Sequence, residues 1–266
     1  MNKSYTLPVK LDKGTGTPLV LLHGLGNNYK SWEYVLEHLD YDRWRVIALD
    51  LLGFGDAPKP DVEYTLKEHS EAVIETLDAL GIKRATFVGH SMGCLVAIKI
   101  ADKRPKLADS LVLLGAPLYR VVPRGGLWRK LTGAEGRYFS LFEVVKKNPD
   151  AIQVGGKIAD ELVPFVKGIE ITQETWPAYR KSLEHTIMQC QSYNQAKRLE
   201  IPTLFVNGLL DFFIIRRNVR SVQRTNRKYI KIRRTLGPHE LTPRQGRTIA
   251  RIIDRQNKAL LKSLDS

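Results

Sequence analysis

The feature that most constrains the fold of this 266-residue chain is an alternation of short apolar runs with stretches of helical periodicity. Most of these runs are rich in Val, Ile, Leu and Phe, as buried strands are. The expected strands are TPLVLLHG (17–24), RWRVIALD (43–50), RATFVGH (84–90), ADSLVLLGAP (108–117), IPTLFVNG (201–208) and KYIKIRR (228–234). Apolar strands that alternate with helices form parallel sheets whose two faces are both covered. We therefore expect an α/β fold, with a mostly parallel sheet and helices on both faces.

Helices are expected between the strands, and two of them carry recognisable start signals. Thr65 and Glu68 form the S/T-x-x-E pattern of a capping box, and Gly81 is a stop signal for the same helix. Ser31 stands where an N-cap would begin another helix. The expected helices cover residues 31–39, 64–82, 91–105 and 243–264.

The interval 118–199 interrupts this alternation. Its patterns are helical, and it contains no convincing strand. An all-helical insertion between two strands of a parallel sheet lies over the carboxyl ends of the strands, where ligands bind in such folds. We therefore expect a core α/β domain in two parts, 1–117 and 200–266, with a helical cap or lid at 118–199.

The chain is strongly basic, with a net charge of +14 at pH 7 and an isoelectric point near 9.8. Much of the excess lies late, since residues 211–262 hold 15 Lys or Arg against Asp211, Glu240 and Asp254. No zinc-finger, RNA-binding or aromatic-interleaved signature accompanies this charge, so a solvated surface is expected and no nucleic-acid partner. Weak association with an anionic membrane surface stays open, and so does the oligomeric state.

Further features of the sequence indicate the cellular compartment of the protein. The N-terminal stretch has no signal-peptide pattern, and no apolar run reaches the about 18–20 residues needed to span a bilayer. Cys94 and Cys190 lie in apolar, helical-looking stretches, and we expect buried free thiols rather than a disulfide. Their spacing suggests no metal site, and neither a metal nor a cofactor is expected. These features predict a cytoplasmic protein.

The stretch GHSMG (89–93) places Ser91 between an expected strand and an expected helix. A serine at such a sharp strand-to-helix turn needs close neighbours without a β-carbon, which Gly89 and Gly93 provide. The turn lifts the hydroxyl above the sheet edge at a helix N-terminus, where backbone N–H groups and the helix dipole favour an anion. Ser91 is therefore the candidate nucleophile.

A serine nucleophile needs a base, and the base needs an orienting acid. His239 follows the last expected strand, and Asp211 follows the strand before it, in the loop of NGLLD. This matches the chain order Ser, Asp, His. Glu240 is the weaker candidate acid, because a residue adjacent to the histidine is badly placed to orient it. A plain surface turn remains the main rival interpretation of Asp211.

The other histidines are assigned less demanding roles. We expect His38 and His69 to be solvent-facing or capping on their helices, and His185 to have a surface or core role. The side chain of His90 should leave the nucleophile turn in another direction, and His23 belongs to a separate loop.

The loop HGLG (23–26) is the candidate oxyanion loop, since its glycines let the backbone approach a ligand. Preorganised N–H donors stabilise the tetrahedral oxyanion of acyl transfer. The expected donors are the backbone N–H groups of Leu25 and of Met92, the residue after the nucleophile. A plain strand-ending turn is the alternative interpretation of this loop.

Taken together, HGLG, DLLGFG, GHSMG, NGLLD and GPHE, in this order, resemble the α/β-hydrolase superfamily over essentially residues 17–255. The similarity is closest to its capped branch of esterases, carbon–carbon bond hydrolases and cofactor-free haloperoxidase-like enzymes. The resemblance implies a Ser91–His239–Asp211 triad, an acyl-enzyme intermediate, and a helical cap between the sixth and seventh strands. Epoxide hydrolases and haloalkane dehalogenases of the superfamily use aspartate as nucleophile, so Ser91 argues against both.

The resemblance also implies a β-hairpin before the HG strand. Here only SYTLPVKL (4–11) and a turn at Gly14–Gly16 precede that strand, which leaves the N-terminal edge of the sheet open.

The leading functional expectation is a carboxylesterase-like serine hydrolase that cleaves a small or medium carboxylic ester. A second hypothesis keeps the triad and changes the bond, giving a hydrolase of vinylogous 1,5-diketones, a lactonase or a perhydrolase. A third, from another class, is a ligand-binding receptor of the same fold with slow or no turnover. A fourth hypothesis is that the basic C-terminal third docks on anionic membranes and that the substrate is lipid-like. The sequence leaves the acyl and alcohol preference open.

Overall fold

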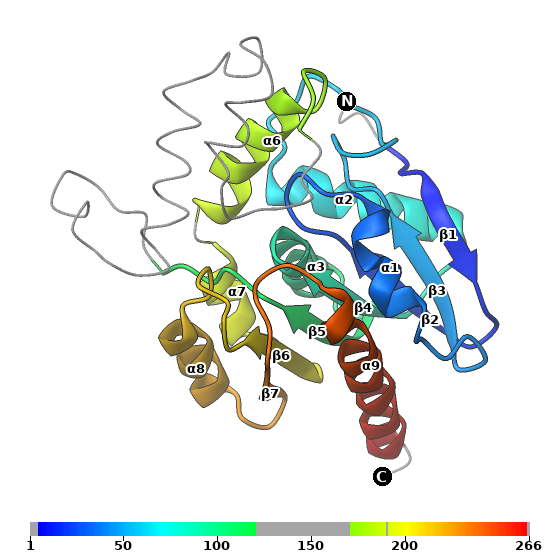
Figure 1. Cartoon of the computed structure of the whole chain (residues 1–266), viewed down its shortest axis with the longest axis vertical. Coiled ribbons are helices and arrows are strands. Elements are labelled where there is room, and N and C mark those ends of the chain that lie inside the picture. The colour runs from blue at the N-terminus through cyan, green and yellow to red at the C-terminus, as the bar shows by residue number, and fades with distance from the viewer. Residues whose placement is uncertain (1–4, 121–170, 190, 265–266) are drawn as a thin grey trace, which may run out of the picture.

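The structure is a computed structural model that describes residues 5–120, 171–189 and 191–264. These residues form a seven-stranded sheet in the order β1-β3-β2-β4-β5-β6-β7 (Figure 1). β1 pairs with β3 in antiparallel fashion, and every other pair is parallel. The strands are β1 (Val9–Lys13), β2 (Thr17–Leu22), β3 (Trp44–Leu49), β4 (Ala85–His90), β5 (Ala108–Leu114), β6 (Thr203–Gly208) and β7 (Ile230–Thr235). The expected α/β fold is confirmed.

Helices cover both faces of the sheet. Side chains alternate between the faces along each strand, and in this sheet apolar side chains lie on both faces and pack against helices. In β2, Val20 and Leu22 join a buried cluster with residues of α2, α3 and α8, whereas Leu19 and Leu21 join one with η1, α1 and α9. None of the helices that the structure describes is long and apolar enough to cross a membrane. The helical segments are η1 (Tyr29–Trp32), α1 (Glu33–Leu36), α2 (Leu66–Ala79), α3 (Met92–Lys103), α6 (Trp176–Ser182), η4 (Leu183–Ile187), α7 (Ser192–Lys197), α8 (Arg216–Thr225) and α9 (Pro243–Leu264).

The N-terminal edge of the sheet has one antiparallel strand, β1, in the described part of the chain. Members of the family that the sequence resembles usually have a hairpin there, and the short stretch that precedes the turn at Gly14–Gly16 forms one strand instead. The sheet of the described residues therefore has seven strands. The helical interval follows β5 and precedes β6, rather than lying between a sixth and a seventh strand.

The helix start signals are right for one helix and wrong for another. At α2, Thr65 accepts a hydrogen bond from the N–H of Glu68, whose side chain accepts one from Thr65, so the capping box is confirmed. The helix predicted at 31–39 is instead the 3₁₀ turn η1 followed by one turn of α-helix. Its cap is Asn28, whose side chain accepts from the backbone, while the Ser31 hydroxyl donates to the Asn28 carbonyl oxygen.

The predicted cap, 118–199, lies largely outside the described residues, because 121–170 are not among them. Its boundaries therefore stay a prediction. The described remainder is helical and comprises α6, the π-helical turn η4 and α7. Buried residues of all three segments join the cluster on the α2–α3 face of the sheet.

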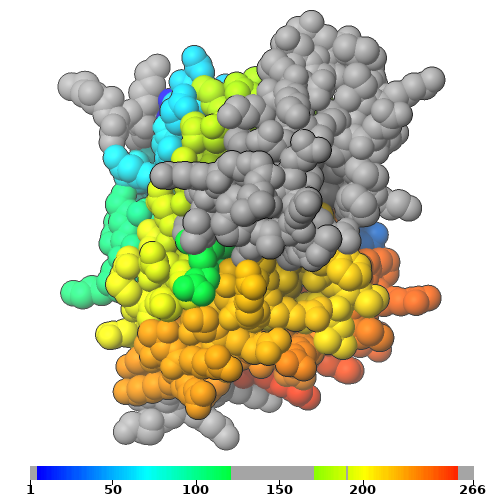
Figure 2. Space-filling model, turned by 90° about the vertical axis from the view of Figure 1, so that its left-hand side faces the viewer, coloured from blue at the N-terminus to red at the C-terminus, as the bar shows by residue number. Residues whose placement is uncertain are grey.

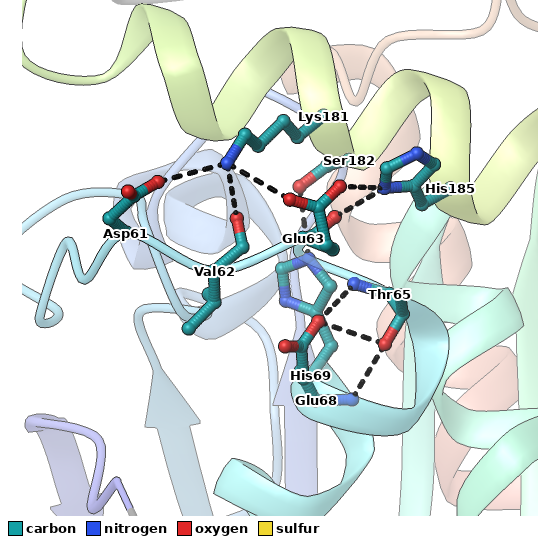
Figure 3. Close-up of polar contacts among 9 residues, drawn as sticks. All are labelled: Asp61, Val62, Glu63, Thr65, Glu68, His69, Lys181, Ser182 and His185. Atoms are coloured by element: carbon teal, nitrogen blue, oxygen red, sulfur yellow. Dashed lines mark hydrogen bonds and ion pairs between the residues drawn. The ribbon is translucent and has the colours of Figure 1, made fainter. Parts of the chain in front are cut away.

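Polar contacts tie α6 and η4 to the loop that precedes α2 (Figure 3). The Lys181 ammonium donates to Asp61 at 3.0 Å, to the Val62 carbonyl oxygen at 2.9 Å and to Glu63 at 3.2 Å. Nδ1 of His185 donates to the Glu63 carbonyl oxygen at 2.7 Å. The described end of the interval is thus anchored on the core by side chains from two consecutive helical segments.

Candidate active site

Ser91 occupies a strained turn between β4 and α3. Its backbone has φ 51° and ψ −116°, a conformation that side-chain-bearing residues rarely adopt. A Cβ on Gly89 would lie 2.5 Å from the carbonyl oxygen of Gly93, and one on Gly93 would lie 2.1 Å from that of Leu22. Because backbone atoms cannot move aside, the turn requires glycine at both positions. The hydroxyl stands at the N-terminus of α3, as the GHSMG pattern predicts.

The structure brings the three predicted side chains together. Ser91 Oγ lies 2.9 Å from His239 Nε2, and His239 Nδ1 lies 2.8 Å from Asp211 Oδ2. Since the carboxylate only accepts, Nδ1 carries the proton, which leaves Nε2 of the neutral ring to accept from the hydroxyl. The exposed fractions are 4% for Ser91, 4% for Asp211 and 9% for His239. The three residues follow β4, β6 and β7, so they meet at the carboxyl edge of the sheet.

The charge environment of His239 favours its protonated form. Burial lowers its pKa, but the hydrogen bond and negative charge of Asp211, aided by Glu240, raise the pKa above its usual 6.5. Burial also raises the pKa of the Glu240 carboxyl, with a further rise from Asp211 and an opposing effect of His239. An imidazolium formed at this position is therefore stabilised by Asp211 and, to a smaller extent, by Glu240.

Two residues that the sequence did not single out hold the acid and base in place. The N–H of Phe213 donates to Asp211 Oδ1 at 2.9 Å, and the Phe213 ring lies 4.8 Å from the His239 ring. Gly115, at the end of β5, has φ +66°, and a Cβ there would lie 3.1 Å from Asp211 Oδ2 and 3.2 Å from His239 Nδ1. The glycine therefore leaves room for the carboxylate–imidazole contact.

The two expected oxyanion donors lie on segments that meet beside Ser91. Met92 is the first residue of α3, and Leu25, with an exposed fraction of 6%, follows β2 in the HGLG loop. A Cβ on Gly24 would lie 3.3 Å from the Ser91 Cβ, so the loop backbone contacts the nucleophile turn. The donor role of the two N–H groups stays a prediction.

His90 forms a hydrogen bond with the backbone of His239. Its Nε2 donates to the carbonyl oxygen of His239 at 2.9 Å, and the centroids of the two imidazole rings lie 5.1 Å apart. Burial lowers the pKa of His90 to about 3, with a further lowering by His239, so the ring is neutral. Nothing in the sequence predicts this contact, although His90 immediately precedes the nucleophile. His23 is likewise buried, and its Nε2 accepts from the N–H of Leu51.

The expectation for His69 is wrong. Its side chain is fully buried, and its Nε2 lies 3.0 Å from the hydroxyl of Ser182 on α6 (Figure 3). Burial lowers the pKa of His69 to about 3. His69 looks solvent-facing when α2 is considered alone, but α6 covers that position. His185 and His38 are partly exposed, and neither approaches the triad through a described contact.

Cys94 is buried and unbridged, as expected, and its Sγ lies 3.1 Å from the Gly89 carbonyl oxygen. Cys190 is outside the described residues. Within the described ranges, no group of three His, Cys, Asp or Glu side chains is arranged to hold a metal ion.

The chain is similar to several curated proteins over part of its length. It is 41% identical over 103 residues to a putative non-heme haloperoxidase of Mycobacterium phage D29, a stretch that covers 39% of this chain and 37% of that protein. It is 38% identical over 109 residues to the 2-hydroxymuconate semialdehyde hydrolase of Pseudomonas sp. strain CF600, covering 40% and 38% of the two chains. The chain thus matches well under half the length of these curated relatives.

Structural comparison extends the similarity to almost the whole chain. A thermophilic esterase from Thermogutta terrifontis matches with a TM-score of 0.70 at 21% identity, covering 98% of each chain. At that level of identity the match shows a shared fold. A family model described as the alpha/beta hydrolase fold matches residues 17–233, which include β2 to β6 and most of β7. With the order of its parallel strands, its turn at Ser91 and this match, the chain belongs to the α/β-hydrolase family.

Proposed function

We propose that the protein is a serine hydrolase that cleaves a small-to-medium carboxylic ester through an acyl-enzyme intermediate. The observation that carries the proposal is the continuous hydrogen-bond chain from Ser91 Oγ through His239 to Asp211, with distances of 2.9 and 2.8 Å. These distances are those of an assembled nucleophile, base and orienting acid. The strained backbone of Ser91 supports the same role, because strain of this kind gathers at functional sites.

In the proposed mechanism, Ser91 Oγ attacks the ester carbonyl carbon while His239 Nε2 takes the hydroxyl proton. The oxyanion accepts hydrogen bonds from the N–H groups of Leu25 and Met92. Collapse of the intermediate breaks the bond to the alkoxy oxygen, which receives the proton from His239 and leaves as the alcohol. Water, deprotonated by the same imidazole, then attacks the acyl carbon. The second tetrahedral intermediate collapses by breaking the bond to Ser91 Oγ, which takes back the proton from His239 as the carboxylic acid is released. Asp211 holds the ring in the required tautomer and stabilises the imidazolium throughout.

Two arguments support an ester as the substrate: the chemistry of the candidate site and the fold shared with a known esterase. A neutral Ser–His pair with two candidate oxyanion donors suits attack on an acyl carbon, and the esterase from Thermogutta terrifontis shares the fold. A second candidate keeps the triad and cleaves a carbon–carbon bond next to a carbonyl group. It is favoured by the relative named 2-hydroxymuconate semialdehyde hydrolase. A perhydrolase activity is the corresponding proposal from the relative named as a haloperoxidase.

Turnover of p-nitrophenyl acetate and butyrate tests the proposal. Wild-type protein should hydrolyse both, and Ser91→Ala should lower kcat/KM by about 10⁴-fold or more. Ser110→Ala is the matched control, because Ser110 is also buried and hydrogen-bonded but lies within β5, where its hydroxyl contacts Thr86. A wild-type rate no higher than that of Ser91→Ala would reject the ester-hydrolase proposal. Turnover of a vinylogous 1,5-diketone but not of any ester would select the carbon–carbon bond candidate.

A further inference from the structure

The loops that follow β6 and β7 expose large apolar side chains. They are Leu209 (43% exposed), Leu210 (52%), Phe212 (59%) and Leu236 (77%), referred to below as the apolar tips. The N–H of Leu209 donates to the Thr235 carbonyl oxygen and that of Leu210 to the Gly237 carbonyl oxygen, so the two loops run side by side. Among the described residues, the remaining exposed large hydrophobic side chain is Val9, on β1 at the other edge of the sheet. The apolar tips therefore form one local group.

Basic residues flank this group along the chain. Residues 212–239 contain nine Lys or Arg and no Asp or Glu. Arg217 and Arg220 are exposed on α8, and Arg233 and Arg234 are exposed on the edge strand β7, next to Leu236. In Figure 2 the gold-to-orange atoms, whose colours include those of α8, form a continuous surface on one side of the molecule. The loops that carry the apolar tips are thus flanked along the chain by exposed arginines of α8 and β7, and these loops with the two elements are called the cationic face below.

We propose that this face docks on an anionic lipid surface, with the apolar tips entering the headgroup region and the surrounding Arg and Lys contacting lipid phosphates and carboxylates. Apolar side chains combined with basic residues are what interfacial binding requires, since each contributes a separate attraction. A second copy of the chain fits less well, because it would bring two cationic faces together. A nucleic acid would satisfy the arginines but would leave the leucines without a role.

The proposed docking orients the candidate active site. Asp211 lies between Leu210 and Phe212 in the chain, and His239 lies three residues after Leu236. The loops that would touch lipid are therefore the loops that carry the acid and the base. Docking would hold the site close to esters dissolved in the lipid phase, although the inference itself does not rest on the proposed function.

Co-sedimentation with vesicles tests the docking, using phosphatidylcholine alone and phosphatidylcholine with about 30 mol% phosphatidylserine. The full-length protein should bind the anionic vesicles, and the bound fraction should fall as salt is raised. Leu210→Ser/Phe212→Ser should lower the partition coefficient by about tenfold. Arg233→Gln/Arg234→Gln should lower it by about fivefold per charge removed at low salt.

Matched variants separate this face from general charge and hydrophobicity. Val9→Ser removes an exposed apolar side chain from the opposite sheet edge, and Lys83→Gln/Lys106→Gln removes two exposed charges near the amino ends of β4 and β5. Both should bind anionic vesicles as the wild type does, and melting temperatures should show all variants folded. Equal binding to neutral vesicles, or equal losses in the control variants, would overturn the proposal. Unchanged vesicle binding of the apolar double variant, together with tight binding of poly(U) RNA, would assign the face to polyanions instead.

Discussion

Gly115→Ala is expected to impair the candidate active site without touching any of its reacting groups. Gly115 has φ +66°, and the added methyl would lie 3.1 Å from Asp211 Oδ2 and from His239 Cε1. Ordinary contacts of this kind begin at 3.4 Å, so the carboxylate and the ring must withdraw by a few tenths of an ångström. The hydrogen bonds that join them to each other and to Ser91 would lengthen or tilt.

The size of the effect follows from two separate terms. The left-handed backbone conformation costs an alanine about 1–2 kcal/mol of stability, whatever surrounds it. Misplacement of reacting groups by 1 Å costs about 10²-fold in rate, so a few tenths of an ångström should lower kcat/KM on the order of five- to tenfold. KM should change little, since the contact is with the acid and base rather than with substrate.

Gly81→Ala is the control that separates the two terms. Gly81 follows α2 with φ +71°, and a Cβ there would have nothing within 4 Å. The substitution should therefore cost the same backbone strain and leave p-nitrophenyl butyrate hydrolysis unchanged. Melting temperature reports the first term, and kcat/KM with the rate of fluorophosphonate labelling reports the second. If the two variants hydrolyse the ester at the same rate, a methyl group at residue 115 does not disturb the carboxylate–imidazole contact, and the reasoning is refuted.

Three further predictions follow from the charges and contacts. Because Asp211 raises the pKa of His239, wild-type kcat/KM should rise with pH through a value above 6.5, and Asp211→Asn should move this limb to lower pH while lowering the rate by about 10⁴-fold. Burial lowers the pKa of His69 and of His90 to about 3, so the unfolded state takes up more protons as pH falls below 6.5. Urea titrations should then show each histidine costing on the order of 2 kcal/mol of stability at pH 5, with the loss continuing towards pH 3, and a flat profile would contradict the burial. Lys181→Met should lower the free energy of unfolding by less than about 1 kcal/mol, because two of the acceptors of its ammonium group are exposed carboxylates.

The sequence predicted the parts of the structure that depend on local signals. The buried strands β2 to β6 are visible as apolar runs, and the edge strand β7 is predicted from its own short pattern after them. The residues that follow these strands must gather at one edge of a parallel sheet. This is why Ser91, Asp211 and His239 could be proposed together although they lie far apart in the chain. The sharp turn at Ser91 can also be predicted, because Gly89 and Gly93 stand on either side of the serine between an expected strand and an expected helix.

The sequence did not predict features that depend on packing between distant segments. His69 looked solvent-facing because nothing in α2 indicates that Ser182 of α6 covers it. The apolar pattern does not predict helix α8, because its several arginines obscure the helical spacing of Val219 and Val222, the apolar residues that pack on the core. Ser31 matched a capping pattern, but Asn28 lay three residues earlier and provided the better-placed acceptor.

Gly115 contributes to the candidate site because it has no side chain. The loop after β5 begins with Gly115, Ala116 and Pro117, and none of these residues carries a carboxylate that could replace Asp211 as the acid. The structure gives the glycine a second meaning, since the space that a side chain would fill there is next to Asp211 Oδ2 and His239 Nδ1. A carboxylate on Asp211 and a side chain at 115 therefore compete for one place beside the imidazole. In this chain the choice of acid and the glycine after β5 are two consequences of the same packing constraint.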